Sequence, residues 1–129
     1  MKKTLILLFI LIASYLEAQV SFSCNYRQDC TWNTANESFD ICEGGPEYSL
    51  FTFNDLETVI VHTTPLGESA YFILNKYAKE EKKLYFYNLV SDTGNDYLLV
   101  LDPKHTEIRV LHKIDKEFYL TKFTIKSGF

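Results

Sequence analysis

Residues 84–102 contain two apolar runs that flank a short polar turn, and this stretch constrains the fold more than any other. Residues 84–90 read Leu-Tyr-Phe-Tyr-Asn-Leu-Val, residues 97–101 read Tyr-Leu-Leu-Val-Leu, and the turn between them includes Gly94 and Asn95. Aromatic and β-branched side chains favour strands, and Gly and Asn accept the positive φ angles of a tight reversal. The stretch therefore predicts a β-hairpin.

The same arrangement of a strand-forming run and a short polar turn repeats from residue 47 onward. We expect strands at 47–53, 57–64, 69–78, 83–91, 96–102, 106–114 and 117–126. Connections this short join antiparallel neighbours, because a parallel return needs a dozen or more residues. The sequence predicts an up-and-down meander over 47–129.

The segment 19–46 is less regular and contains all three cysteines. Alternation of apolar and polar residues indicates a first strand over 20–26, with Cys24 on its apolar face. Turn-forming residues are frequent over 27–45, and Gly-Gly-Pro stands at 44–46. Both features are typical of irregular structure. We expect this segment to precede the meander as an irregular region.

Several of the expected strands are apolar on both faces. In 69–78, for example, Tyr71 and Ile73 lie on one face, and Phe72 and Leu74 lie on the other. Such strands are central in a sheet, and seven or eight of them leave long open edges unless the sheet closes or curls. The predicted fold is all-β, a small barrel or a strongly bent half-barrel of 7–8 strands.

The amino terminus has the layout of a cleaved secretory signal over residues 1–18. Lys2 and Lys3 precede an apolar run from Leu5 to Leu16, and Ala18 offers a small residue at the cleavage point. A retained anchor is the alternative, but the run is shorter than the roughly 20 residues of a membrane span. We therefore expect an exported protein of bacterial type, periplasmic or extracellular, whose domain is 19–129.

Removal of the signal leaves 111 residues, enough for a single domain with one core. The mature chain carries 11 basic and 16 acidic residues, a net charge of about −5 with neutral histidines. Nucleic acids and anionic lipids bind clusters of basic residues, and the chain has none. We expect neither as a partner, and no membrane span after cleavage.

Cys24, Cys30 and Cys42 predict disulfide chemistry, as in other exported chains. Because Cys24 falls on an apolar strand face and Cys30 lies among polar residues, we expect a Cys24–Cys42 bond. Cys30 would then be free or paired to another molecule. A Cys30–Cys42 bond is the alternative. Acylation of Cys24, as in a lipoprotein, is disfavoured because no aliphatic residue stands in Ser-Phe-Ser before it.

An exported meander of short-looped strands with a disulfide resembles the calycin group, the lipocalin-like barrels, over about the last 80 residues. The resemblance implies a barrel that is filled by side chains or holds one small ligand. The Gly-x-Trp of lipocalin first strands is missing, since Cys30 stands two residues before Trp32. The resemblance therefore assigns no ligand-binding residue.

The sequence lacks the parts of an enzyme. His62, His105 and His112 have no Cys, Asp or Glu at ligand or triad spacing, and no Gly-x-Ser-x-Gly occurs. Acids that would serve glycoside hydrolysis all stand where turns or strand ends favour an acid, namely Glu57, Asp92, Asp96 and Asp102. We expect no catalytic residue.

Metal ligands are equally sparse. The chain has no Cys-x-x-Cys and no His pair for zinc. Residues 92–96 resemble a calcium loop only in part, because Gly94 stands where a ligand belongs and no bidentate Glu follows. We expect no metal and no cofactor.

Aromatic residues make up 16% of the chain, which is the one unusual quantity. Core packing accounts for any single ring, whereas so many tyrosines together would line a pocket or a partner surface. The candidate ligand-binding residues are Tyr71, Tyr85, Tyr87, Tyr97, His112 and Tyr119. The sequence predicts a non-enzymatic protein that binds a small amphipathic ligand. The alternative is a protein–protein module such as an inhibitor, an immunity-type protein or an envelope subunit.

Overall fold

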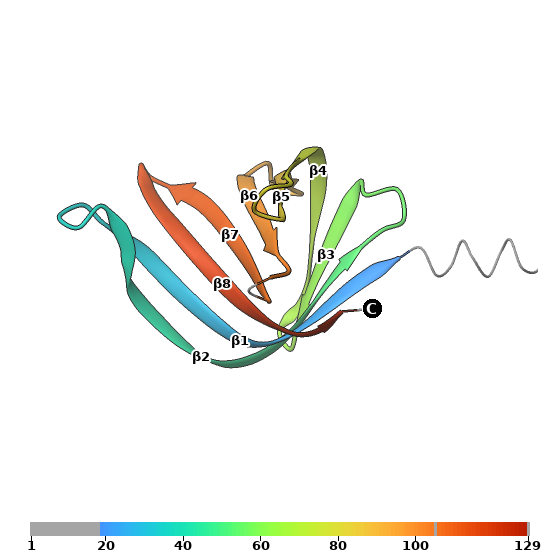
Figure 1. The fold of residues 1–129 in the computed structure, drawn as a ribbon, viewed down its shortest axis with the longest axis horizontal. Helices are drawn as coiled ribbons and strands as arrows, with labels where there is room; N and C mark the ends of the chain where they lie inside the picture. The colour runs from blue at the N-terminus through green and yellow to red at the C-terminus, as the bar shows by residue number, and fades with distance from the viewer. Residues whose placement is uncertain (1–18, 105, 129) are drawn as a thin grey trace, which may run out of the picture.

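Eight antiparallel strands make up the structure, a computed structural model that describes residues 19–104 and 106–128 (Figure 1). The strands are β1 (Val20–Asn33), β2 (Ser38–Phe53), β3 (Val59–Thr64), β4 (Gly67–Lys79), β5 (Leu84–Ser91), β6 (Asp96–Asp102), β7 (Glu107–Ile114) and β8 (Glu117–Gly128). The expected signal sequence and His105 lie outside the described residues. Within them no helix is long and apolar enough to cross a membrane.

The strands form a closed barrel in which each one pairs with the next and β8 pairs with β1. This confirms the predicted all-β meander and decides for closure over an open half-barrel. The 84–102 hairpin is β5 and β6. Its turn is closed by hydrogen bonds from Gly94 N–H to the Ser91 carbonyl and from Ser91 N–H to the Asn95 carbonyl. Gly94 has a φ of 87°, which an L side chain rarely adopts.

The prediction of an irregular region within 19–46 is wrong over 27–45, whereas the first strand expected over 20–26 is the start of β1. The long strands β1 and β2 pair from Val20 and Phe53 at one end to Asn33 and Ser38 at the other. β3 pairs only with residues 50–53 of β2, so the rest of β2 has one neighbour, β1, and its other edge is unpaired. Pro46 is tolerated in this part of the strand because prolines occur on edge strands. A bulge between Cys24 and Tyr26 shifts the register of β1. In this segment the pairing of β1 with β2 outweighs the local preference of its residues for turns.

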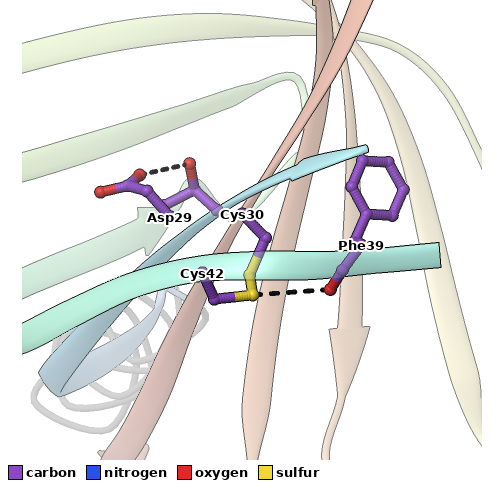
Figure 2. Close-up of a disulfide and its surroundings, with 5 residues drawn as sticks. Asp29, Cys30, Phe39 and Cys42 are labelled. Atoms are coloured by element: carbon purple, nitrogen blue, oxygen red, sulfur yellow. Dashed lines mark hydrogen bonds between the residues drawn. A yellow bond between two sulfur atoms is a disulfide. The ribbon is translucent and has the colours of Figure 1, made fainter. Parts of the chain in front are cut away.

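The β1–β2 hairpin extends beyond the other strands, at the left of Figure 1, and we call its residues 27–45 the arm. Cys30 and Cys42 face each other across the arm and form the disulfide (Figure 2). The predicted Cys24–Cys42 bond is therefore wrong, and Cys30 is neither free nor intermolecular. Pairing decides this, because Cys24 lies opposite Ser49, far from Cys42 along β2.

The core fills the barrel interior with side chains from alternate positions of the strands. It includes Ile60, Leu99 and Ile108, all essentially inaccessible to solvent, and the free thiol of Cys24. Each fully buried aliphatic side chain contributes roughly 1.5–3 kcal/mol relative to exposure. This core stabilises one end of the barrel, and more polar residues line the interior at the other end.

Candidate ligand cavity

A cavity of about 320 Å³ lies inside the barrel, next to the core. We call it the barrel cavity. Its apolar wall consists of Phe51, Leu89, Leu99, Val110 and Phe123. Its polar wall consists of Arg27, His62, Thr64, Ser69, Tyr71, Tyr97, His112 and Thr121. The volume is at the lower end of the range of small-molecule sites, about 300–1,000 Å³.

The barrel interior changes from apolar to polar along several strands, and this change shapes the cavity. On β3 the inward positions read Ile60, His62 and Thr64, and on β7 they read Ile108, Val110 and His112. β6 and β8 follow the same order toward the polar end of the barrel. On β6 Leu99 is followed by Tyr97, and on β8 Phe123 is followed by Thr121 and Tyr119. Because alternate residues of a strand share one face, each strand carries this gradient in its own sequence.

His62 lines the barrel cavity and is packed between two phenylalanine rings. Its ring stacks on Phe51 with centroids 4.1 Å apart and meets the edge of Phe123 at 5.0 Å. Its Nε2 atom is buried and has no hydrogen-bond partner among the described residues. Burial, aided by the positive charge of Arg27, lowers the pKa of His62 to about 4. His62 is therefore a neutral imidazole near pH 7.

His112 is flanked by two tyrosine rings. Its centroid lies 5.4 Å from that of Tyr97 and 5.5 Å from that of Tyr119. The Nδ1 atom is buried without a partner in the described part of the chain. Burial lowers the pKa of His112, and Arg27 acts in the same sense against the opposing effect of Asp29. Two neutral imidazoles thus offer unmade hydrogen bonds in one cavity.

Arg27 is the cationic residue of the polar wall, and carboxylates surround it. Its Nε and Nη2 atoms donate to Asp29 at 3.2 Å, and its Nη1 atom lies 3.5 Å from Glu47 Oε1. Asp29 also accepts a 2.9 Å hydrogen bond from the Thr121 hydroxyl. The guanidinium carbon lies 5.7 Å from the centre of the Phe123 ring. Arg27 is held in place by these contacts.

A second hollow of about 490 Å³, which we call the mouth groove, adjoins the barrel cavity. The two share Arg27, His112 and Thr121 in their walls. From these residues the mouth groove runs along the arm past Asp29 and Glu43 to Tyr119. The arm therefore extends the interior of the barrel outward as one wall of the groove.

The structure brings together four of the six predicted ligand-binding residues. Tyr71, Tyr97 and His112 line the barrel cavity, and Tyr119 lines the mouth groove. Tyr85 and Tyr87 instead line a separate hollow of about 210 Å³ beside Val20, Phe22 and Leu101. Tyr87 belongs to the core, and its placement there follows from the inward face that it shares with Leu89.

The predicted set omits most of the residues that line the barrel cavity, and His62 and Arg27 are the most important of those omitted. His62 is not among the candidate ligand-binding residues, although its alternation with Ile60 and Thr64 indicates an inward position. Arg27 was assigned to the irregular segment. No local signal reveals it, because its place depends on the bulge in β1 and on pairing with Phe123, almost a hundred residues away.

The acids considered for catalysis lie elsewhere. Glu57 pairs with Lys76, and Asp102 pairs with Arg109 at 2.9 Å. Asp92 and Asp96 flank the β5–β6 turn. None of the four lines the barrel cavity. Among residues 19–104 and 106–128, no three His, Cys, Asp or Glu side chains group as metal ligands.

Comparison with protein families, curated proteins and solved structures gives no match to this chain. The function is therefore inferred from the cavity itself.

Proposed function

We propose that this protein is a non-enzymatic binding protein that holds a small amphipathic molecule in the barrel cavity. The interior gradient carries the proposal. An apolar wall around Leu99 and Val110 would receive the body of the ligand, and a polar wall around His62 and His112 would receive its head. Binding sites commonly combine an apolar surface with a few convergent polar groups.

The unpartnered imidazole nitrogens support the same proposal. A buried polar atom without a hydrogen bond costs about 1–3 kcal/mol, and a ligand that supplies the bond removes this cost. Both nitrogens, His62 Nε2 and His112 Nδ1, belong to residues of one cavity.

Native mass spectrometry of the protein exported from its own host tests the proposal first. We expect a fraction of the protein to carry an added mass of a small molecule, released on denaturation. Titration of the purified protein with an apolar fluorescent probe is the second test. A protein that carries no added mass and also does not bind the probe would contradict the proposal.

A cavity-filling variant shows whether binding occurs in the barrel cavity. Val110→Phe adds a ring to the apolar wall and should abolish probe binding. Val61→Phe is the matched control, because Val61 alternates with the inward residues Ile60 and His62 and so faces outward. Probe binding by Val110→Phe as strong as that by Val61→Phe would place the probe outside the barrel cavity.

We also propose export, with cleavage after Ala18. The Cys30–Cys42 disulfide supports it, because such bonds persist in oxidising compartments. The mass of the protein recovered from the periplasm or the medium should begin at Gln19 and be two hydrogens below the reduced chain. A chain that retains residues 1–18 would contradict cleavage.

The free edge of β2 favours a second candidate function, a protein–protein module. Between Ser38 and Tyr48 this strand pairs with β1 alone, and Tyr48 and Ile41 are 69% and 56% exposed. Unpaired backbone groups on an edge accept an added strand from a partner. Tyr48→Asp, which introduces a charge on this edge, should then abolish capture of a stable partner while probe binding persists. Retention of the partner by this variant would exclude the β2 edge.

A further inference from the structure

The charge of the polar wall indicates which head group the ligand carries. Arg27 is the cation of the barrel cavity, but three of its five N–H groups already point at the carboxylates of Asp29 and Glu47. An anionic ligand on the other two N–H groups would lie beside both carboxylates, which repel it. Arg27 is therefore a poor receptor for an anion.

The histidines add no positive charge to this wall. Burial lowers the pKa of both His62 and His112, so each is a neutral ring with one donor and one acceptor nitrogen. The basic residues nearest along the strands face the other way. Lys122 and Lys113 alternate with the inward residues Thr121 and His112 and so lie on the outer face.

Carboxylates outnumber cations at the mouth groove. Asp29 and Glu43 line the groove, and Glu47 lies beside Arg27. With Arg27 these groups sum to two negative charges. The Glu43 carboxylate is exposed on the arm and forms no ion pair with any described residue. The local field therefore attracts a cation.

Aromatic rings stand beside these carboxylates. Tyr97 and Tyr119 flank His112 at 5.4 and 5.5 Å, where the barrel cavity meets the mouth groove. Faces of such rings attract organic cations. The Tyr119 hydroxyl donates to Glu117 at 2.9 Å, so its oxygen keeps only acceptor capacity toward a ligand.

We propose that the ligand is a small organic amine. Its apolar body would lie against Leu99 and Val110, and its ammonium group would lie at the mouth groove between the carboxylates and the rings. The buried Nδ1 atom of His112 would accept one ammonium N–H. The cavity volume of about 320 Å³ corresponds to roughly ten water-sized groups at about 30 Å³ each, so the body is small. This inference rests on the proposed function and specifies its ligand.

Three probes of matched size and different charge test the inference: phenethylamine, phenethyl alcohol and phenylacetate. Calorimetry or protein-observed NMR at pH 7 should give an affinity for the amine about tenfold higher than for phenylacetate, with the alcohol between them. The preference should shrink as salt is raised, because salt screens the charge. Equal or tighter binding of the alcohol or the acid would overturn the amine inference.

A charge variant at the mouth groove provides the second test. Glu43→Gln should weaken phenethylamine about threefold and leave the alcohol unchanged. Glu80→Gln, on the exposed β4–β5 turn, makes the same change in net charge away from the cavity and is the matched control. An unchanged amine affinity in Glu43→Gln would overturn the assignment of this carboxylate.

The outcomes separate the two proposals. A native adduct or a bound apolar probe together with no preference for the amine would contradict only the head group. Failure of all three matched probes, of the native adduct and of the apolar probe would contradict ligand binding as a whole.

Discussion

At the scale of single residues, buried titratable groups have properties that simple experiments detect. His62 and Cys24 both lie inside the barrel, one at the cavity and one in the core. Burial disfavours the charged form of each side chain, so it lowers the pKa of the histidine and raises that of the thiol. The shift at His62 makes the free energy of unfolding depend on pH, and the shift at Cys24 makes the reactivity of the thiol depend on pH.

We expect His62 to make the folded state less stable as the pH falls from about 6.5 to about 4. In this window the unfolded chain protonates the imidazole, whereas the folded protein, with a pKa of about 4, does not. Above pH 6.5 the residue is neutral in both states and contributes no pH dependence. The loss should reach roughly 2–3 kcal/mol. Urea denaturation across this pH range measures it.

His62→Phe keeps a ring against Phe51 and removes the titration. The pH dependence of the unfolding free energy between pH 6.5 and 4 should be shallower in this variant than in the natural protein. The two curves should run parallel above pH 7. Parallel curves over the whole range would show that His62 does not resist protonation.

Cys24 should be the unreactive free thiol of the protein. Burial raises its pKa to about 11, and the Ser49 side chain opposes this shift only in part. At pH 8 the thiolate fraction is then roughly two hundredfold below that of an ordinary cysteine. A thiol reagent should label the native protein very slowly. In denaturant without reductant it should label one cysteine, and peptide mapping should identify it as Cys24. Labelling at Cys30 would contradict the Cys30–Cys42 bond.

At the scale of elements, the arm depends on a disulfide and on close approach of its two strands. It extends past the barrel, where β2 has β1 as its one neighbour. β8 also pairs with β1 as far as Thr31, so only the tip of the arm beyond this residue is a two-stranded hairpin, which by itself is marginally stable in water. The Cys30–Cys42 bond stabilises the arm at the base of this tip.

Replacement of both Cys30 and Cys42 by Ser should destabilise the protein by about 2–3 kcal/mol, because the bond closes a short loop of the unfolded chain. Denaturant unfolding measures the change. Amide exchange of the arm should accelerate more than that of β5 and β6. Uniform acceleration along the chain would show that the bond does not act mainly on the arm.

Two adjacent glycines of β2 give a matched test of strand approach. A Cβ atom at Gly44 would meet the Arg27 carbonyl oxygen at 2.8 Å and the Tyr26 ring at 3.1 Å, whereas one at Gly45 meets nothing within 4 Å. We expect Gly44→Ala to cost about 1–3 kcal/mol and Gly45→Ala to cost much less. Thermal unfolding of both variants measures the difference. Equal stabilities would contradict the close approach at Gly44.

At the scale of the whole molecule, the interior gradient should produce a gradient in stability. The end of the barrel around Ile60 and Ile108 is packed with apolar side chains, and the end around Thr64 and His112 surrounds the cavity. Regions with less apolar burial open more readily.

Native-state amide exchange should therefore be slower at Ile60, Leu101 and Ile108 than at Thr64, Tyr97 and His112, although these residues occupy the same strands β3, β6 and β7. Occupation of the cavity should slow exchange at the second group, because a ligand that binds only the folded state stabilises it. Faster exchange at the core end would contradict the gradient.

The sequence by itself determined most of the strands and turns. From residue 47 onward the predicted strands agree with β2–β8 to within a few residues, except that β2 begins earlier, at Ser38. Alternation has a period of two residues, and turn chemistry spans two to five, so both signals are local. Four of the six candidate residues reach the cavity or its mouth groove because their strands carry the gradient in their own residues.

The tertiary structure alone decided closure, the disulfide and the polar wall. Pairing of β1 with β8 closes the barrel, and it brings Arg27 to Phe123 and Asp29 to Thr121. Register decided that Cys30 rather than Cys24 lies opposite Cys42. The physical reason is the same in each case. Contacts between distant segments depend on which strands pair and in what register, and a one-residue shift turns every side chain of a strand to the opposite face.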